Sequence, residues 1–389
     1  MIHFLVPAAG AFGMEDYLAL DRPSPAGRFR IIPYERLGEH KSFDRGTYVF
    51  SGLDQLHGAS QRLVVQLHDA LAGAPGVRLL NDPRRTLRRF PLLAALHQSG
   101  RNMFRAARAD GDLAPLRYPV FLRTERFHGG SISPLLDSRR ALEAAIGLAL
   151  LRGHTLSDLL AIEYCSTAAS DGLFRKYAAF KVGDRILGRC LYHGRDWMLK
   201  FEGSEYTREF VLEEQEYVMH NPHAAALAEI FGVAAVDYGQ IDYALLDGRI
   251  QTWEINVNPT IGRGVGLNAG PSDDELRQIR SVTRDYFFDW FREAWGAVDL
   301  RPAIGAPIRV TFEPSAVAAA AQAAAHEVRD ARVVTGAGGA RSGPVGNVLR
   351  AILRPVKRPL QRISTPLLRV IAFAARSWSR RPALLGDAP

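Results

Sequence analysis

The chain has 389 residues, of which 47% are hydrophobic and 23% charged, a balance typical of a globular protein with room for two or three cores. Its two cysteines exclude a disulfide framework and fit a reducing cytoplasm, and no apolar run reaches the roughly 18 residues of a membrane span. The net charge of +8 is concentrated beyond residue 300, where 14 Lys or Arg stand against 4 Asp or Glu, so it does not indicate a core that binds nucleic acid.

The first 85 residues are predicted to form a small α/β layer. Short strands are expected at 2–7, 28–33, 48–53 and 77–80, with an amphipathic helix over 60–73. Strands that alternate with helices favour a parallel sheet. The segment has neither a basic leader nor a G-x-G-x-x-G motif, so neither export nor a dinucleotide site is expected.

A basic helix follows this layer. An Asn-Asp-Pro turn at 81–83 precedes a helix predicted over 86–99, which carries Arg89 and is closed by Gly100. Arginine binds phosphate well through its planar fork. A solvated helix face is the alternative interpretation of Arg89 and the arginines near it.

The next strand leads into a glycine-rich loop. The strand is predicted over 118–123 and ends at Arg123, and the loop after it contains Gly129, Gly130 and Ser131. Glycines allow backbone N–H groups to approach phosphate oxygens closely. This pattern alone indicates an anion-binding loop only weakly.

A helix over 137–152 is followed by a segment, 155–165, that ends as a buried strand. Glu163 stands at the end of this strand, directly before Tyr164 and Cys165. A role in ligand binding is one interpretation of Glu163, and a strand-end salt bridge is the alternative.

Two further strands surround a turn at 182–184. The first, over 171–181, contains Lys176, and a cationic side chain in a half-buried sheet needs an anionic partner. A helical region over 207–231 is interrupted at 221–222, where the sequence is Asn-Pro. It leads into a hairpin.

The hairpin over 240–262 carries the most informative pattern. Its turn is predicted at Asp247-Gly248, and in the second strand Glu254 and Asn256 alternate with apolar residues, so their oxygens share one face. Asp242 lies in the first strand. Two carboxylates and an amide oxygen suit Mg²⁺ that also binds phosphates.

The register decides whether this site can form. A regular two-residue turn would pair Asp242 with Trp253 and direct the carboxylate to the apolar face. We therefore predict either a β-bulge or a three-residue connection, which would bring Asp242 opposite Glu254. An ordinary amphipathic hairpin is the alternative.

The last 120 residues contain a closing helix and a basic tail. The helix is predicted over 272–295, with its aromatic residues in the core. A Gly-rich linker then precedes the segment 347–381, in which Arg alternates with Leu, Ile and Val and three prolines favour short helices. Peripheral contact with an anionic membrane is one expectation, and docking on an acidic partner is the alternative.

The acid in one strand followed by Glu-x-Asn-x-x-Pro resembles the metal signature of the ATP-grasp superfamily, which includes D-alanine:D-alanine ligase and the ribosomal-protein glutamate ligase. The resemblance covers roughly residues 75–300. It implies that Asp242, Glu254 and Asn256 bind Mg²⁺, with Mn²⁺ as an alternative.

The order of the other elements also matches this superfamily. The resemblance implies that Arg89 binds phosphate, that Arg123 and its glycine-rich loop bind ATP, and that the end of the strand at 155–165 forms a hinge beside the nucleotide. The implied ATP-binding residues are Arg89, Arg123, Gly129, Gly130, Ser131, Glu163, Tyr164 and Cys165. Arg89 and Arg123 stand where the family has Lys, and Gln240 stands where D-alanine:D-alanine ligase has an Arg. Lys176 or Arg263 would then supply the missing catalytic cation.

The expected fold class is α/β and α+β: an N-terminal parallel layer (1–85), an ATP-grasp domain (86–300), and a linker with a basic tail (301–389). The implied activity is an ADP-forming carbon–nitrogen ligase that joins a small-molecule or peptide carboxylate to an amine through an acyl phosphate. A cytoplasmic location, with membrane association through the tail, is expected. A small-molecule kinase on the same scaffold and a non-catalytic ATP-binding protein are the alternatives.

Overall fold

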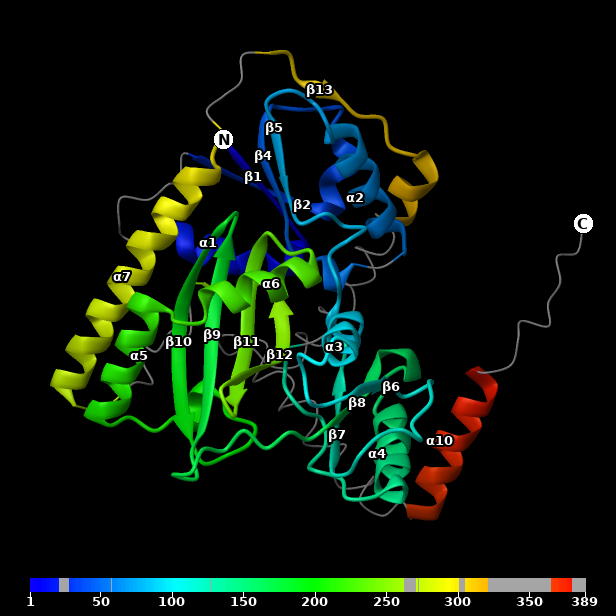
Figure 1. Ribbon diagram of the computed structural model, residues 1–389. Coiled ribbons are helices and arrows are strands. Elements are labelled where there is room, and N and C mark those ends of the chain that lie inside the picture. The colour runs from blue at the N-terminus through cyan, green and yellow to red at the C-terminus, as the bar shows by residue number, and fades with distance from the viewer. Residues whose placement is uncertain are drawn as a thin grey trace, which may run out of the picture. The chain divides into compact units, whose positions relative to one another are not determined.

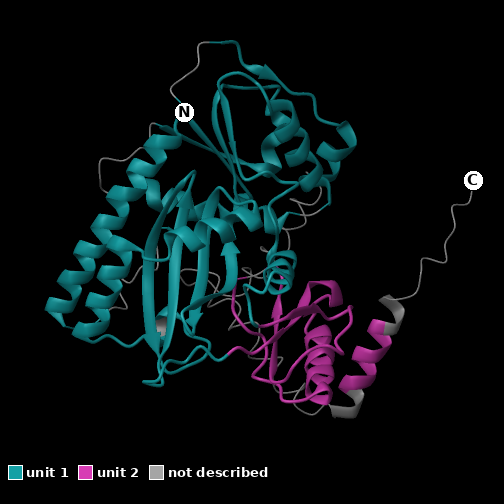
Figure 2. Cartoon of the chain, in the orientation of Figure 1, with its two compact units in different colours: residues 1–103, 166–324 teal, residues 104–165, 325–389 magenta. Residues whose placement is uncertain are grey.

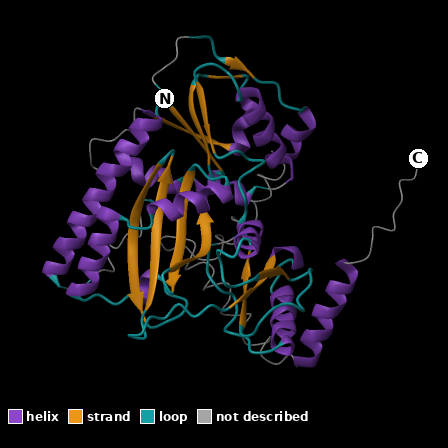
Figure 3. Ribbon diagram, viewed as in Figure 1, coloured by secondary structure: helices purple, strands orange, loops and turns teal. Residues whose placement is uncertain are grey.

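The computed structural model describes residues 1–20, 28–56, 58–126, 128–261, 271, 273–300, 305–320 and 365–379. By compactness the chain divides into unit 1, residues 1–103 and 166–324, and unit 2, residues 104–165 and 325–389 (Figure 2). The predicted boundaries at 85 and 300 both lie inside unit 1. Helices and strands are mixed in the chain (Figure 3), and its sheets include parallel and antiparallel pairs, which confirms the α/β and α+β class.

Unit 1 begins with a parallel sheet in the order β2-β1-β4-β5. The strands lie close to their predicted ranges: β1 (Ile2–Val6), β2 (Phe29–Pro33), β4 (Gly46–Phe50) and β5 (Val77–Leu80). Every residue of β1 and β4 is buried, as expected for inner strands of a parallel sheet. Helix α2 (Gly58–Leu71) buries a single apolar stripe, formed by Leu63, Val64, Leu67 and Leu71.

The second sheet of unit 1 is antiparallel, in the order β10-β9-β11-β12 (Figure 1). Its elements are β9 (Phe174–Val182), β10 (Arg185–Gly194), β11 (Tyr238–Leu246) and β12 (Arg249–Asn256), with helices α5 (Arg208–His220), α6 (Ala224–Ala234) and α7 (Asp274–Val298). Tyr177 packs against Tyr217 of α5, whereas Phe180 packs against Phe287 and Phe291 of α7. Because Tyr177 and Phe180 point to opposite faces, both faces are covered. We call the face that carries Phe180 the α7 face.

A buried asparagine at the end of β5 joins the two sheets of unit 1. Asn81 is 0% exposed and has a φ of +66°, a conformation that Asn tolerates better than most residues. Its amide donates to the carbonyls of Phe50 and Tyr238 at 3.1 and 2.8 Å and accepts the N–H groups of Asp237 and Tyr238 at 2.8 and 3.0 Å. The predicted Asn-Asp-Pro turn is therefore a structural joint.

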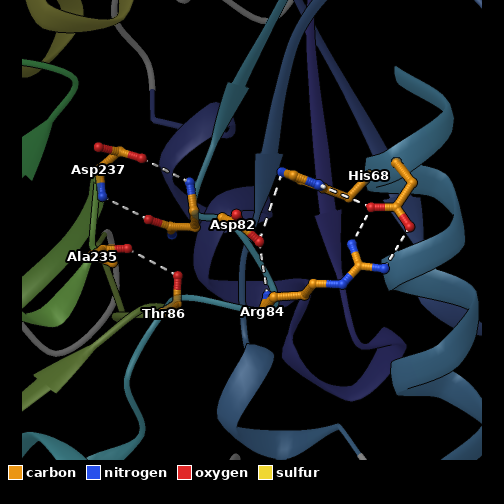
Figure 4. Close-up of polar contacts among 8 residues, drawn as sticks. His68, Asp82, Arg84, Thr86, Ala235 and Asp237 are labelled. Carbon is orange, nitrogen blue, oxygen red and sulfur yellow. Dashed lines mark hydrogen bonds and ion pairs between the residues drawn. The ribbon is translucent and has the colours of Figure 1, made fainter. Parts of the chain in front are cut away.

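The turn after Asn81 is also tied to α2 (Figure 4). Arg84 pairs with Asp69, and its N–H donates to the Asp82 carboxylate at 2.8 Å. His68 lies within 4.0 Å of Asp82. The Thr86 hydroxyl donates at 3.0 Å to the carbonyl at the C-terminal end of α6, so the turn contacts both layers of unit 1.

Residues 305–320 fold back onto unit 1. The strand β13 (Ile308–Arg309) pairs with β3 (Ser42–Phe43). Four apolar residues after it are buried in the main core, namely Val310, Phe312, Ala316 and Ala320. The expected linker therefore does not begin at 301, because this stretch supplies core side chains.

Unit 2 contains an antiparallel sheet in the order β6-β8-β7 and the helix α4. The elements are β6 (Ala106–Arg108), β7 (Val120–Thr124), β8 (Leu159–Glu163) and α4 (Arg139–Leu151). Val120 and Leu122 share a core with Leu142 and Ile146 of α4. By alternation Arg123 lies on the other face of the sheet.

Helix α10 (Thr365–Ser379) packs along α4. Gly147 permits this approach, since a Cβ there would collide with the backbone of Leu368. Arg369 pairs with Glu143 at 3.0 Å, and Ala372 is fully buried. Part of the basic tail therefore belongs to the core of unit 2.

The outer side of α10 stays apolar. Val370 is 60% and Phe373 73% exposed, and Pro366 lies in the first turn of the helix, where proline is tolerated. Among the described helices, none combines the length and apolarity that a membrane crossing requires.

Candidate functional site

Asp242 and Glu254 lie directly opposite each other on β11 and β12. The connecting turn has two central residues, Asp247 and Gly248, with φ values of +50° and +73°, as a type I′ turn requires. A regular ladder from this turn would place Trp253 opposite Asp242. A β-bulge takes Trp253 out of register and brings Glu254 into its place, so the predicted bulge is confirmed.

A basic side chain pairs with each carboxylate. Lys176 Nζ lies 2.6 Å from Asp242 Oδ2, and Arg89, the first residue of α3 (Arg89–Gln98), pairs with Glu254 Oε2. The Arg89 side chain is only 3% exposed. Burial by itself would lower the pKa of Lys176, but the Asp242 carboxylate, with Glu254 behind it, raises that pKa above its usual value. Lys176 therefore stays protonated, and the two acids face two cations.

Two amide side chains lie next to these carboxylates, on the same two strands. Gln240 donates Nε2–H to Asp242 Oδ1 at 2.9 Å, and its cross-strand partner is Asn256. Asn256 Oδ1 accepts the N–H of Asn258 at 2.8 Å, which fixes the side chain. Asn258 in turn donates Nδ2–H to the carbonyl of Gly10 at 3.2 Å. The end of the hairpin is thereby anchored to the parallel layer.

The α7 face thus presents oxygen atoms of Asp242, Glu254 and Asn256 on adjacent strands, since residues opposite each other share a face. Mg²⁺ takes oxygen ligands and usually binds through one or two carboxylates plus substrate phosphates. Among the described residues, no group of three or more His, Cys, Asp or Glu side chains could hold a metal alone. The donor set fits a cation that completes its coordination with phosphate oxygens.

In unit 2, Arg123 and the glycine-rich loop follow each other as predicted. The Arg123 side chain is nearly buried, with 7% exposed, on the sheet face away from α4. Gly130 has a φ of +91°, a conformation that favours glycine. Ser131 Oγ lies 2.6 Å from the carbonyl of Ser133 and 3.0 Å from that of Leu122, so this hydroxyl anchors the loop to β7.

Glu163 forms a strand-end salt bridge, the alternative interpretation of this residue. Its carboxylate accepts the N–H groups of Arg105 and Arg117 at 2.9 and 2.7 Å and pairs with the Arg117 guanidinium at 2.8 Å. Burial alone would raise the pKa of Glu163, but these hydrogen bonds lower it below its usual value. The Tyr164 N–H donates to the carbonyl of Pro119 at 2.9 Å. Both groups are therefore used to hold the segment in place.

The remaining expected positions can also be placed. Cys165 is a half-buried free thiol at the end of the first segment of unit 2, and Arg263 lies outside the described residues. The sequence pattern did not single out Arg189, a buried arginine on β10. The sequence does contain an indication of its importance, because Arg189 is a charged residue within an otherwise apolar predicted strand, ILGRCLY.

Several solved structures are similar to the chain. D-alanine–D-alanine ligase from Bacillus anthracis in complex with ATP shares 13% identity over 76% of this chain and 97% of that one, with a TM-score of 0.43. A second structure of that ligase gives 12% identity, the same coverage and a TM-score of 0.42. An L-amino acid ligase from Bacillus licheniformis shares 12% identity over 77% of each chain, with a TM-score of 0.36. No protein-family model and no curated protein matches the chain.

Proposed function

We propose that the chain is an ATP- and Mg²⁺-dependent ligase that joins a carboxylate to an amine through an acyl phosphate. The observation that carries this proposal is the pairing of Asp242 with Glu254 across the bulged hairpin, with a cation on each. Bringing two carboxylates and two cations together on a half-buried sheet face costs desolvation energy, which favours a functional role.

Asp242, Glu254 and Asn256 would hold Mg²⁺, which supplies positive charge to the phosphate oxygens of ATP when it is bound. Lys176 and Arg89, already beside these carboxylates, are proposed to neutralise phosphate oxygens. The nucleotide-binding positions proposed in unit 2 are Arg123 and the backbone of its loop, Gly129, Gly130 and Ser131, together with the segment of Glu163, Tyr164 and Cys165.

The proposed reaction has two steps. An oxygen of the substrate carboxylate attacks the γ-phosphorus of ATP, the bond to the β-phosphate oxygen breaks, and ADP leaves. The amine then attacks the acyl carbon, the carbon–oxygen bond to phosphate breaks, phosphate leaves, and the amine nitrogen loses a proton. Phosphoryl transfer needs positioning and charge neutralisation more than covalent help, and Lys176 supplies a cation on the face of Asp242.

The proposal is tested by ADP release in the presence of Mg²⁺ with pooled carboxylic acids and pooled amines, separately and together. A ligase releases ADP and phosphate only when both pools are present. ADP released with one compound and without phosphate would identify a kinase, and ATP binding without ADP release would identify a non-catalytic protein. Glu254→Gln should abolish release, whereas Asp247→Asn, in the exposed turn of the same hairpin, should preserve it.

A further inference from the structure

Arg189 lies in a second β-bulge, on β10. Gly188 keeps the regular register with β9, and the register shifts between Gly188 and Cys190, so Arg189 is the additional residue. Cys190 pairs with Ala178, and Ala178 pairs with Asp242. Arg189 therefore adjoins the same row across the sheet that contains the two carboxylates of the candidate metal site.

The Arg189 side chain is enclosed by α7. The residue is 5% exposed, and its guanidinium carbon lies 4.1 Å from the ring centre of Phe287 and 5.6 Å from that of Phe288. Phe287 also packs on Phe180, so Arg189 lies on the α7 face with Asp242. Its one polar contact within the described part of the chain is the carbonyl of Ile261, at 3.4 Å from Nη2.

The buried charges around Arg189 do not balance. Glu214 is the acid that faces this cluster, and it pairs with Arg280 at 3.0 Å, with both side chains largely buried. Burial raises the pKa of Cys190 to about 11 and also raises that of Tyr192, so neither neighbour offers an anion. The charges of Arg280 and Glu214 cancel, and the guanidinium of Arg189 remains as an excess positive charge among these buried groups.

An excess buried cation is expensive unless an anion compensates it. A guanidinium does not escape this cost by losing its proton, and its planar fork matches the two oxygens of a carboxylate. A guanidinium that lies over an aromatic ring, as Arg189 lies over Phe287, can still donate from the edge of its fork to such a group. The geometry therefore calls for an oxyanion that the described part of the chain does not supply.

We infer that Arg189 binds the carboxylate of the substrate that the ligase activates, an inference that rests on the proposed function. Cys190 and Asp242 are two strands apart in one row, about 10 Å between their backbones. A carboxylate at Arg189 and the phosphoryl group transferred to it occupy that interval. Arg189 thus supplies a cation to the reacting group. The residue two positions before Asp242, Gln240, is uncharged and does not supply one.

The test uses the full chain and acetate, the simplest carboxylate, without ATP. Thermal unfolding is followed while sodium acetate replaces sodium chloride at constant ionic strength. Wild type should show a saturable rise in Tm with acetate. Arg189→Met, which keeps length and removes charge, should weaken this binding by about tenfold or more, and Arg189→Lys should retain part of it.

Stability separates a binding role from a structural one. Without acetate, Arg189→Met should unfold at the same temperature as wild type or higher, because it removes an uncompensated buried charge. Arg280→Met is the matched control and should lower Tm by about 3 °C or more, because it strands the buried Glu214. Equal acetate binding by wild type and Arg189→Met, or a loss of Tm in Arg189→Met as large as in Arg280→Met, would overturn the inference.

Kinetics distinguish this inference from the ligase proposal. Once a pooled acid supports ADP release, Arg189→Met should raise the KM for that acid by about tenfold or more and leave the KM for ATP unchanged. An unchanged KM for the acid would remove Arg189 from the site while the ligase stands. Acetate binding that depends on Arg189, in a chain that releases no ADP with any pool, would remove the ligase proposal and leave the anion site.

Discussion

Arg89 and Glu254, 165 residues apart in the sequence, form a buried ion pair between the first turn of α3 and the bulged strand β12. The pair has a structural consequence besides its place in the candidate site. Replacing Glu254 with a neutral residue takes a carboxylate away from a guanidinium that is 3% exposed. Stability and activity are therefore coupled at this position.

Glu254→Gln is expected to lower the free energy of unfolding by about 3 kcal/mol, because one charge of a buried pair loses its counterpart. The double variant Arg89→Met with Glu254→Gln should recover most of this loss, since it removes both charges. Urea unfolding of the two variants and of wild type measures the effect. A single variant as stable as wild type would show that the pair contributes nothing to folding.

The buried hydrogen bonds of Asn81 should make this residue more important for stability than Asp247, which also has a positive φ but lies in an exposed turn. Asn81→Ala strands backbone groups of Phe50, Asp237 and Tyr238 and also strains a residue with positive φ, so a loss of about 4 kcal/mol is expected. Asp247→Ala, at an exposed turn position with a φ of +50°, carries the backbone strain alone and should cost about 1 kcal/mol. Similar losses in chemical unfolding of both variants would contradict the role of the buried hydrogen bonds.

Protonation of Glu163 is expected to make the stability of the fold depend on pH. Its hydrogen bonds with Arg117 and two backbone N–H groups hold the pKa of the folded state below its usual value. The carboxylate therefore stabilises the fold above the pKa of the unfolded chain, about 4.3, and this contribution disappears as the pH falls through the lower pKa of the folded state.

The matched variant for this effect is Glu163→Gln, which keeps the shape of the side chain. It should be less stable than wild type near neutral pH, and the difference should shrink steadily below about pH 4. Unfolding with urea across that range measures it. A difference that stays constant with pH would show that the charge of Glu163 is not responsible.

The basic tail predicts association with anionic membranes. On α10, Arg369 is engaged by Glu143, while Val370 and Phe373 remain exposed on the outer side of the helix. Full-length protein should float with vesicles that contain phosphatidylserine and should not float with vesicles of neutral lipid alone. Phe373→Asp should reduce flotation without unfolding unit 2, since this side chain is 73% exposed. Equal, negligible flotation with both kinds of vesicle would exclude membrane contact.

Local patterns in the sequence predicted most elements of the fold. β5, α4 and α7 lie within two or three residues of their expected ranges, because helix periodicity, Gly and Asn-Pro breaks are short-range signals. The bulge at Trp253 was also predictable, since only one register directs Asp242 and Glu254 to the same face.

The interactions that hold the site together could not be predicted in this way. The partner of Arg89 is set by packing across 165 residues, and the bulge that carries Arg189 has no sequence signature of its own. Glu163 illustrates the opposite case, because the sequence offered both a salt bridge and a ligand role, and the contacts with Arg117 establish the salt bridge. These contacts join residues that are far apart in the sequence, so local sequence patterns do not reveal them.

Asp242, Glu254 and Asn256 are proposed to bind the divalent cation of a metal–ATP complex. Titration of the protein into Mn²⁺–ATP, followed by the enhancement of water proton relaxation, tests this without knowledge of the substrates. Wild type should give saturable enhancement; Asp242→Asn and Glu254→Gln should each weaken binding by about tenfold or more, and Asp247→Asn should match wild type. Equal enhancement by all four proteins would show that these residues do not bind the metal–ATP complex.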